Sequence, residues 1–195
     1  MSLHNKKIIL ASTSPRRREL LEKIGLEFEV VGSDYEEDMS LALEPLDLAK
    51  HLSLGKAEAV AKHCPDHLII AADTFVVLGK KLLGKPGTPE KALEMLKEVS
   101  GNTMSVISGL TIIDTRNTIT ISKSLETKVF IKKLTDREIQ HYVDSGEPLD
   151  KAGAFAIQGL GAVMIEKIEG DYYTIMWLPL HLLSEMLKEF GVNVL

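Results

Sequence analysis

The chain has few of the residues and patterns that would mark a secreted or membrane protein. It has one cysteine, Cys64, in 195 residues. A single cysteine excludes an internal disulfide and any multi-cysteine metal site, and it fits a reducing compartment. No segment has the roughly 18 apolar residues of a membrane span, and the N-terminus has no signal-peptide pattern. We therefore expect a cytoplasmic protein with no membrane partner.

An excess of positive charge is also absent. The net charge of -5 argues against a nucleic-acid polymer as partner, because such binding depends on Lys and Arg that neutralise phosphates. A small anion in a local basic pocket is compatible with this charge. A chain of 195 residues, 45% of them hydrophobic, predicts one domain over residues 1–195. Met1-Ser2-Leu3 is given no structural weight, since such a tripeptide can be left by cloning.

Strand patterns alternate with helix patterns along the chain, which predicts an α/β fold with a mixed sheet flanked by helices. We expect strands or extended segments over residues 7–11, 28–31, 68–72, 75–83, 104–113, 119–132, 154–168 and 173–177. Segment 75–83 reads as a hairpin with its turn near Gly79-Lys80, and 104–132 as an antiparallel ribbon. We expect helices over residues 15–24, 45–62, from Thr88-Pro89 to Gly101, from the capping box at Thr135-x-x-Glu138 to Gly146, and over 180–190.

One helix start breaks a local rule. If Ser14 is the N-cap and Pro15 the first helical residue, then Arg16, Arg17 and Arg18 lie in the first turn, at the positive end of the helix dipole. Three cations there are unfavourable unless an anion joins them. Free N–H groups, guanidinium forks and nearby hydroxyls suit a phosphate. A solvated basic helix start is the alternative.

Acidic residues follow at two places. Asp73 comes directly after the apolar segment 68–72, and ligands collect at the carboxyl ends of strands in open α/β sheets. The alternative is an Asp that begins a turn. Asp34, Glu36, Glu37 and Asp38 could supply a ligand for a hard cation, since Mg²⁺ takes one or two carboxylates plus phosphate oxygens and waters.

Two apparent motifs do not hold. Gly79-x-x-x-x-Gly84-Lys85 begins like a P-loop, but Pro86 stands where the metal-binding hydroxyl is needed. Lys85 and Lys56 are still candidates for phosphate binding as point charges. Gly159-Leu160-Gly161 lacks the third glycine of a dinucleotide fingerprint and indicates close backbone packing instead.

Taken together, several segments resemble the Maf family of nucleoside triphosphate pyrophosphatases, in order and spacing from about Ile8 to Leu187. They are Ser12-Thr13-Ser14-Pro15-Arg16-Arg17, Lys56-Ala57, Ala72-Asp73-Thr74, Gly84-Lys85-Pro86, Ser100-Gly101-Asn102-Thr103 and Glu147-Pro148-Leu149-Asp150-Lys151-Ala152-Gly153. The resemblance implies a mixed α/β fold with a deep cleft, related to inosine triphosphatases. It also implies cleavage between the α- and β-phosphates, with a divalent metal, Mg²⁺ or Mn²⁺, as cofactor and a homodimer as a possible assembly.

The resemblance carries roles onto matching positions of this sequence. It implies catalytic roles for Asp73, Lys56 and Lys85, metal binding by Glu37, and substrate binding by Ser12, Arg16, Arg17, Thr74 and Gln158. Arg16, Thr74 and Gln158 match the family branch that acts on dTTP and UTP. The sequence departs from that branch in reading Ala154-Phe155-Ala156-Ile157-Gln158 where Ala-Tyr-Gly-Ile-Gln is usual.

The expected mechanism is hydrolysis of a small nucleotide, in which the cations neutralise charge that develops in the transition state. Asp73 would orient the attacking water and accept its proton, or it would bind the metal. The alternative from a different class is a nucleotide-binding regulator of septum formation that does not need turnover, since the family was first linked to cell division.

Overall fold

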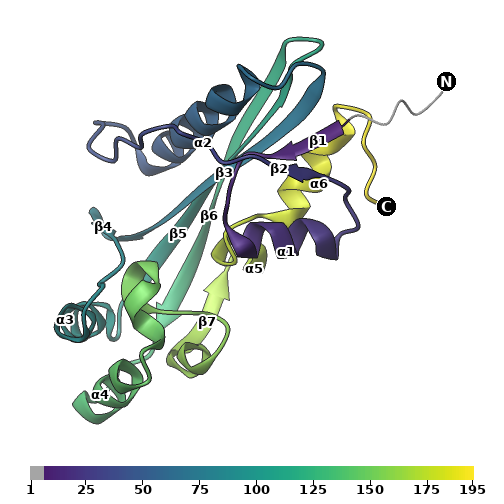
Figure 1. Cartoon of the computed structure of the whole chain (residues 1–195). Coiled ribbons are helices and arrows are strands. Elements are labelled where there is room, and N and C mark those ends of the chain that lie inside the picture. Colours follow the sequence, from purple (N-terminus) through teal and green to yellow (C-terminus); the bar gives the residue numbers. More distant parts are fainter. Residues whose placement is uncertain (1–6) are drawn as a thin grey trace. The chain divides into compact units, whose positions relative to one another are not determined.

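The computed structural model describes residues 7–195 (Figure 1). The chain forms two compact units, and strands β3 (His67–Leu78), β5 (Thr103–Asp114) and β6 (Ile119–Ile131) contribute residues to both. Unit 1 runs up to Thr74 and adds Ser108–Leu125 and Met176–Leu195, whereas unit 2 comprises Phe75–Ile107 and Glu126–Ile175. The prediction of a single domain stays a prediction.

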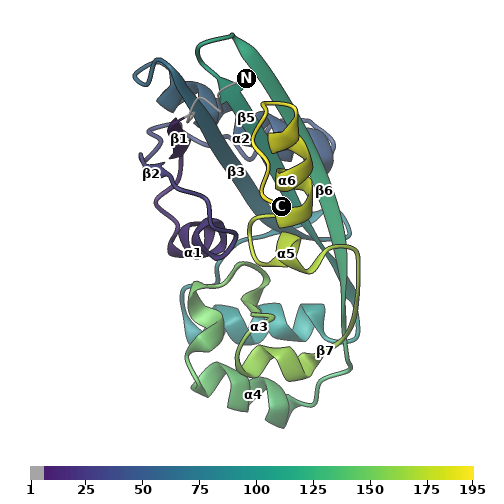
Figure 2. The same ribbon diagram turned by 90° about the vertical axis from the view of Figure 1, so that its right-hand side faces the viewer.

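Besides parts of β3, β5 and β6, unit 1 contains two whole strands and three helices. These are β1 (Lys7–Leu10), β2 (Glu29–Val30), α1 (Pro15–Lys23), α2 (Pro45–Ala61) and α6 (Leu180–Lys188). Helices α2 and α6 lie on opposite faces of this part of the sheet (Figures 1 and 2). Helix α2 buries Ala57 and Val60 against Ile9 of β1 and Ile69 of β3. An apolar core thus fixes the helix that carries Lys56.

Unit 2 holds the remaining elements. These are β4 (Lys81–Leu83), α3 (Pro89–Val99), α4 (Asp136–Asp144), β7 (Ile165–Glu169), the short helix α5 (Tyr172–Ile175), and the 3₁₀ turns η1 (Glu147–Asp150), η2 (Ala152–Ala154) and η3 (Leu160–Met164). Leu96 of α3, Val129 of β6 and Tyr142 of α4 belong to one buried cluster. This cluster is the core of unit 2.

Within residues 7–195, a seven-stranded sheet has the order β2-β1-β3-β5-β6-β7, with β4 paired to β3. Strand β1 is parallel to β2 and β3, whereas β3–β4 and β6–β7 are antiparallel pairs. The predicted mixed α/β sheet is therefore confirmed. In this part of the chain no helix is long and apolar enough to cross a membrane.

Most of the helix boundaries and turns expected from the sequence are confirmed. Pro15 begins α1, and Gly25 follows its end with φ +73°, a conformation that favours glycine. Thr135 and Glu138 form the predicted capping box of α4. The turn expected near Gly79-Lys80 joins β3 to β4.

Two expectations were wrong. Asp73 does not follow a strand but lies inside the 12-residue strand β3. The strand can continue because the buried side chains of Asp73 and Thr74 have polar partners, Lys56 and Ser108.

The expected extended segments 154–168 and 173–177 are mostly turns and helix. The N–H groups of Leu160 and Gly161 donate to the carboxylate of Glu147 instead of a neighbouring strand. Asp171 Oδ2 accepts from the N–H of Thr174 at 2.6 Å and so begins the turn of α5. A run of apolar residues alone does not distinguish such turns from a strand.

Candidate functional site

The loop between β1 and α1 places a serine hydroxyl beside the start of a helix. Ser14 is the extended N-cap of α1, and its side chain makes no capping hydrogen bond. The Ser14 N–H donates to Oγ of Ser12 at 3.2 Å. Because a helix N-terminus offers free N–H groups and the positive end of the dipole, this uncapped turn suits an anion.

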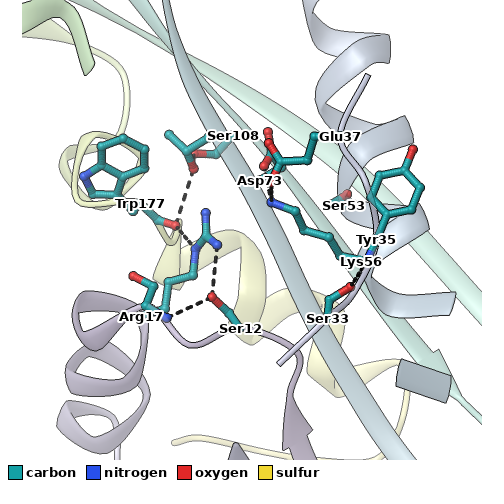
Figure 3. A network of polar contacts seen from close by, with 12 residues as sticks. Ser12, Arg17, Ser33, Tyr35, Glu37, Ser53, Lys56, Asp73, Ser108 and Trp177 are labelled. Atoms are coloured by element: carbon teal, nitrogen blue, oxygen red, sulfur yellow. Dashed lines mark hydrogen bonds and ion pairs between the residues drawn. The ribbon is translucent and has the colours of Figure 1, made fainter. Parts of the chain in front are cut away.

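Arg17 turns inward from the first turn of α1 and has only 7% of its surface exposed. Its Nε donates to the carbonyl oxygen of Trp177 at 3.0 Å, and its Nη1 donates to Oγ of Ser12 at 3.2 Å (Figure 3). Burial lowers the pKa of the guanidinium, whereas the carboxylates of Asp73 and Glu37 raise it. Both hydrogen bonds end on neutral oxygens, so the guanidinium still favours an anion such as phosphate.

The other two arginines of this helix start differ from Arg17. Arg16, the second residue of α1, is half-buried. Arg18 is 64% exposed, and its Nε lies 2.8 Å from Oε1 of Glu22, one turn further along the helix. The hydrogen bond to Glu22 raises the pKa of Arg18. One of the three cations is therefore already paired with a carboxylate of its own helix.

Lys56 joins two carboxylates. Its Nζ lies 2.5 Å from Oδ1 of Asp73 and 2.6 Å from Oε1 of Glu37 (Figure 3). The exposed fractions of the side chains are 13% for Lys56, 7% for Asp73 and 44% for Glu37. The buried pair comes from α2 and β3, whereas Glu37 reaches it from the loop between β2 and α2. Glu36, the residue before Glu37, is exposed.

Thr74 is buried next to Asp73 in β3. Its Oγ1 lies 2.7 Å from Oγ of Ser108 in β5 and 3.5 Å from the carbonyl oxygen of Trp177. Trp177 has a φ of +78°, a region in which a bulky residue is strained and which is often found at functional sites. Ser108 and Trp177 were not predicted from the sequence, because one hydroxyl in a strand and one backbone carbonyl leave no sequence pattern.

The remaining predicted residues belong to unit 2. Lys85 is exposed in the loop between β4 and α3. The backbone of this loop is hydrogen-bonded to the segment around η1 and η2, through Gly87 N–H to Leu149 O at 2.9 Å and Gly153 N–H to Gly84 O at 3.1 Å. Two of the segments that carry the family resemblance therefore lie side by side.

Gln158 is exposed in the bend before η3. The residues after it are held by Glu147, whose carboxylate accepts hydrogen bonds of 2.9 Å from Leu160 N–H, Gly161 N–H and the Tyr142 hydroxyl. Burial alone would raise the pKa of Glu147, but these three hydrogen bonds lower it overall. Glu147 was not predicted as a site residue, and only the Glu-Pro-Leu-Asp segment could have pointed to it.

The donor set around Lys56 fits a hard divalent cation. Glu37 and Asp73 already converge on one positive charge, and Mg²⁺ binds one or two carboxylates together with phosphate oxygens and water. Among residues 7–195 there is no group of three or more His, Cys, Asp or Glu side chains suited to a metal. This composition fits a cation that the substrate helps to bind more than a closed structural site.

Known proteins similar to this chain agree on one family. The model of the Maf family, described as Maf-like protein, matches residues 7–190. A dTTP/UTP pyrophosphatase of Methanosarcina mazei is 50% identical over 97% of this chain and 96% of its own length. Proteins of the same name from a Thermoanaerobacter species and from Bacillus cereus are 49% and 45% identical over 97% of this chain, and over 100% and 98% of their own lengths.

One solved structure shares the fold. The Ham1 protein of Staphylococcus aureus superimposes with a TM-score of 0.53, over 95% of this chain and all of its own, at 17% identity. At this identity the structural match shows the fold alone, whereas the sequence matches over nearly the whole chain show the family. The chain belongs to the Maf family.

Proposed function

We propose that this protein hydrolyses dTTP and UTP to the nucleoside monophosphate and pyrophosphate. The observation that carries the proposal is the cluster in unit 1, in which Lys56 joins Asp73 and Glu37 close to the buried guanidinium of Arg17. Carboxylates near phosphate are unfavourable without a cation, so this mixture of charges fits a metal-dependent phosphate site. The choice of dTTP and UTP as substrates follows the names of relatives that are up to 50% identical to this chain.

The phosphate groups would be bound by the first turn of α1. Arg17 and Arg16 supply guanidinium groups, and Ser12 supplies a hydroxyl that already orients Arg17. Lys85 would act as a further point charge. The donors of α1 and of the loop before it would neutralise charge that grows on the phosphate oxygens in the transition state.

Glu37, and in the alternative role Asp73, would hold a divalent cation, Mg²⁺ or Mn²⁺. When bound, the cation supplies Lewis-acid stabilisation of the phosphate oxygens. Lys56 then has two tasks: it keeps the two carboxylates together, and it adds a positive charge of its own.

Asp73 would position the attacking water and take up its proton. The Lys56 ammonium holds Oδ1 of Asp73, which fixes the orientation of the carboxylate. The strand position of Asp73 restricts it further, since β3 is buried on both sides of this residue. A general base of this kind must lie within hydrogen-bond reach of the water, and such rigidity favours that geometry.

Gln158 would select the base. Its amide carries both a donor and an acceptor, which match N3–H and O4 of uracil or thymine. Guanine presents adjacent donors at N1 and N2, which suit a carboxylate better. An amide at this position therefore favours dTTP and UTP over purine nucleotides.

The test is pyrophosphate release from a panel of nucleoside triphosphates, with and without Mg²⁺. We expect release from dTTP and UTP in the presence of Mg²⁺ and much slower release from GTP. Nucleotide binding without any pyrophosphate release would favour the alternative, a nucleotide-binding regulator of cell division. The cytoplasmic location and the homodimer stay predictions.

A further inference from the structure

Helix α2 contains a glycine in its interior, where glycine is the least favourable residue other than proline. Gly55 lies in the middle of this 17-residue helix. The space above it is taken by the ring of Tyr35. A Cβ on residue 55 would lie 2.4 Å from both Cε2 and Cζ of that ring. Only glycine therefore allows the ring to lie so close to the helix backbone.

Tyr35 is fixed in the loop between β2 and α2, the same loop that carries Glu37. Its N–H donates to Oγ of Ser33 at 3.2 Å (Figure 3). Its hydroxyl lies 3.4 Å from Nε2 of His51. The hydroxyl contact is exposed and long, so we expect ring packing to provide most of the attachment. Residues 31–38 of this loop have no helix or strand.

The contact between Tyr35 and Gly55 lies next to the ion pair between Glu37 and Lys56. Glu37 is two residues after Tyr35, and its partner Lys56 directly follows Gly55 in α2. Glu37 is 44% exposed whereas Lys56 is 13% exposed, and an ion pair with one partner in solvent holds a loop less firmly than a buried apolar contact does. The packing of Tyr35 on Gly55 supplies the apolar contact that the ion pair lacks.

We propose that Tyr35 and Gly55 form a clasp that positions the Glu37 carboxylate next to Lys56 and Asp73. Tyr35 is a positioning residue, which acts through Glu37. The inference rests on the proposed function only in giving Glu37 a role in cation binding and turnover. The contact between Tyr35 and Gly55 does not depend on which ligand binds at this site.

The central variant is Gly55→Ala, which forces the ring of Tyr35 away from the helix. Alanine is the better helix former, so the melting temperature should stay the same or rise. We expect kcat/KM for dTTP to fall by about 10-fold or more and the Kd for Mn²⁺ without nucleotide to rise, since precise placement of site residues has effects of this size or larger. Glu58→Ala, at an exposed position of α2, is the control for helix propensity and should change neither value.

Tyr35→Ala should cause a similar loss, whereas Tyr35→Phe should retain most of the activity because the ring remains. In the double variant Gly55→Ala/Tyr35→Ala the steric conflict is gone. The loss of kcat/KM in the double variant should therefore be no larger than in Tyr35→Ala alone, as expected for two residues that act through one contact. Fully additive losses would overturn the clasp.

A crystal structure of Gly55→Ala separates this inference from the proposed function. Displacement of Glu37 from Lys56 supports the clasp even if the wild-type protein hydrolyses no nucleotide. A structure in which Glu37 still contacts Lys56, together with unchanged Mn²⁺ affinity and kcat/KM, overturns it. Conversely, active wild-type enzyme with fully active Gly55→Ala leaves the proposed function intact and removes the clasp.

Discussion

The ammonium group of Lys56 lies 2.5 Å from Oδ1 of Asp73, and both side chains are largely buried. A buried ion pair seldom stabilises a fold more than apolar residues would, because both charges lose their hydration. Its presence between α2 and β3 is thus better explained by chemistry than by stability. Glu37 adds a second negative charge beside the pair, and both carboxylates also interact with the buried guanidinium of Arg17.

Asp73→Asn should remove most turnover with little change in fold. The substitution is nearly isosteric, and Lys56 keeps Glu37 as a partner. Loss of a catalytic proton acceptor commonly reduces rate by about 10² to 10⁴-fold, so kcat for dTTP should fall by this amount while nucleotide affinity changes little. Asp136→Asn, at the exposed start of α4, is a suitable control. Normal kcat in a folded Asp73→Asn protein would remove Asp73 from the mechanism.

Arg17→Lys is a sharper test of phosphate binding than Arg17→Ala. Both variants lose the forked hydrogen bonds to Ser12 and to the Trp177 carbonyl, but lysine keeps the charge. We expect Arg17→Ala to raise KM for the triphosphate by about 10- to 100-fold, in line with the loss of a charge-assisted hydrogen bond. The KM of Arg17→Lys should lie between those of the wild type and Arg17→Ala. If KM and kcat stay unchanged in Arg17→Ala, the guanidinium does not bind substrate.

Activity should require an added divalent cation. After removal of metal with excess EDTA, we expect turnover to stop and to return with Mg²⁺ or Mn²⁺, since two carboxylates converge near the helix start that we propose to bind phosphate. Glu37→Gln should raise the cation concentration needed for half-maximal activity. Full turnover in EDTA would contradict the metal requirement and leave Glu37 with a purely electrostatic role.

Gln158→Glu should weaken the preference for pyrimidines. A carboxylate cannot donate to O4 of thymine or uracil, so kcat/KM for dTTP and UTP should drop by about 10-fold or more, while that for GTP drops less. Changing Arg16 and Thr74, the other two residues that match the dTTP and UTP branch, in the same protein should extend the effect. The single variant is easier to interpret, because Thr74 is buried against Ser108 and a larger side chain there disturbs the strand. A wild-type preference for GTP over both dTTP and UTP would refute this role.

The capping box of α4 should make unit 2 sensitive to acid. The pKa of Glu138 is lowered from 4.5 to about 2, first by its hydrogen bond with Lys132 and then by those with Thr135. A lowered pKa means that the carboxylate stabilises the fold above pH 4.5 and that this contribution is lost as the pH falls toward about 2. The free energies of unfolding of wild type and Glu138→Gln in urea should therefore differ at pH 6, and the difference should shrink as the pH falls from 4.5 to about 2. An equal difference at pH 6 and at about pH 2 would argue against the ionic contribution.

Local signals identified most of the elements correctly. Proline at the first helical position, glycine after the last, and the Thr135 capping box depend on residues close together in sequence, so they mark helix boundaries without tertiary information. Segments that depend on distant partners were read less well. Leu160 and Gly161 form a turn because Glu147, more than ten residues earlier, accepts their N–H groups.

The sequence by itself determined the alternation of helices and strands, the family, and the identity of the candidate residues, because these follow from local pattern and from motifs in order. Only the tertiary structure decided which of those residues meet. It paired Glu37 with Lys56, buried Arg17 while Arg18 is paired on the helix surface, and brought the carbonyl of Trp177 to a guanidinium 160 positions away. Such contacts depend on the packing of α2 and α1 with the sheet, and packing joins residues that no spacing along the chain connects.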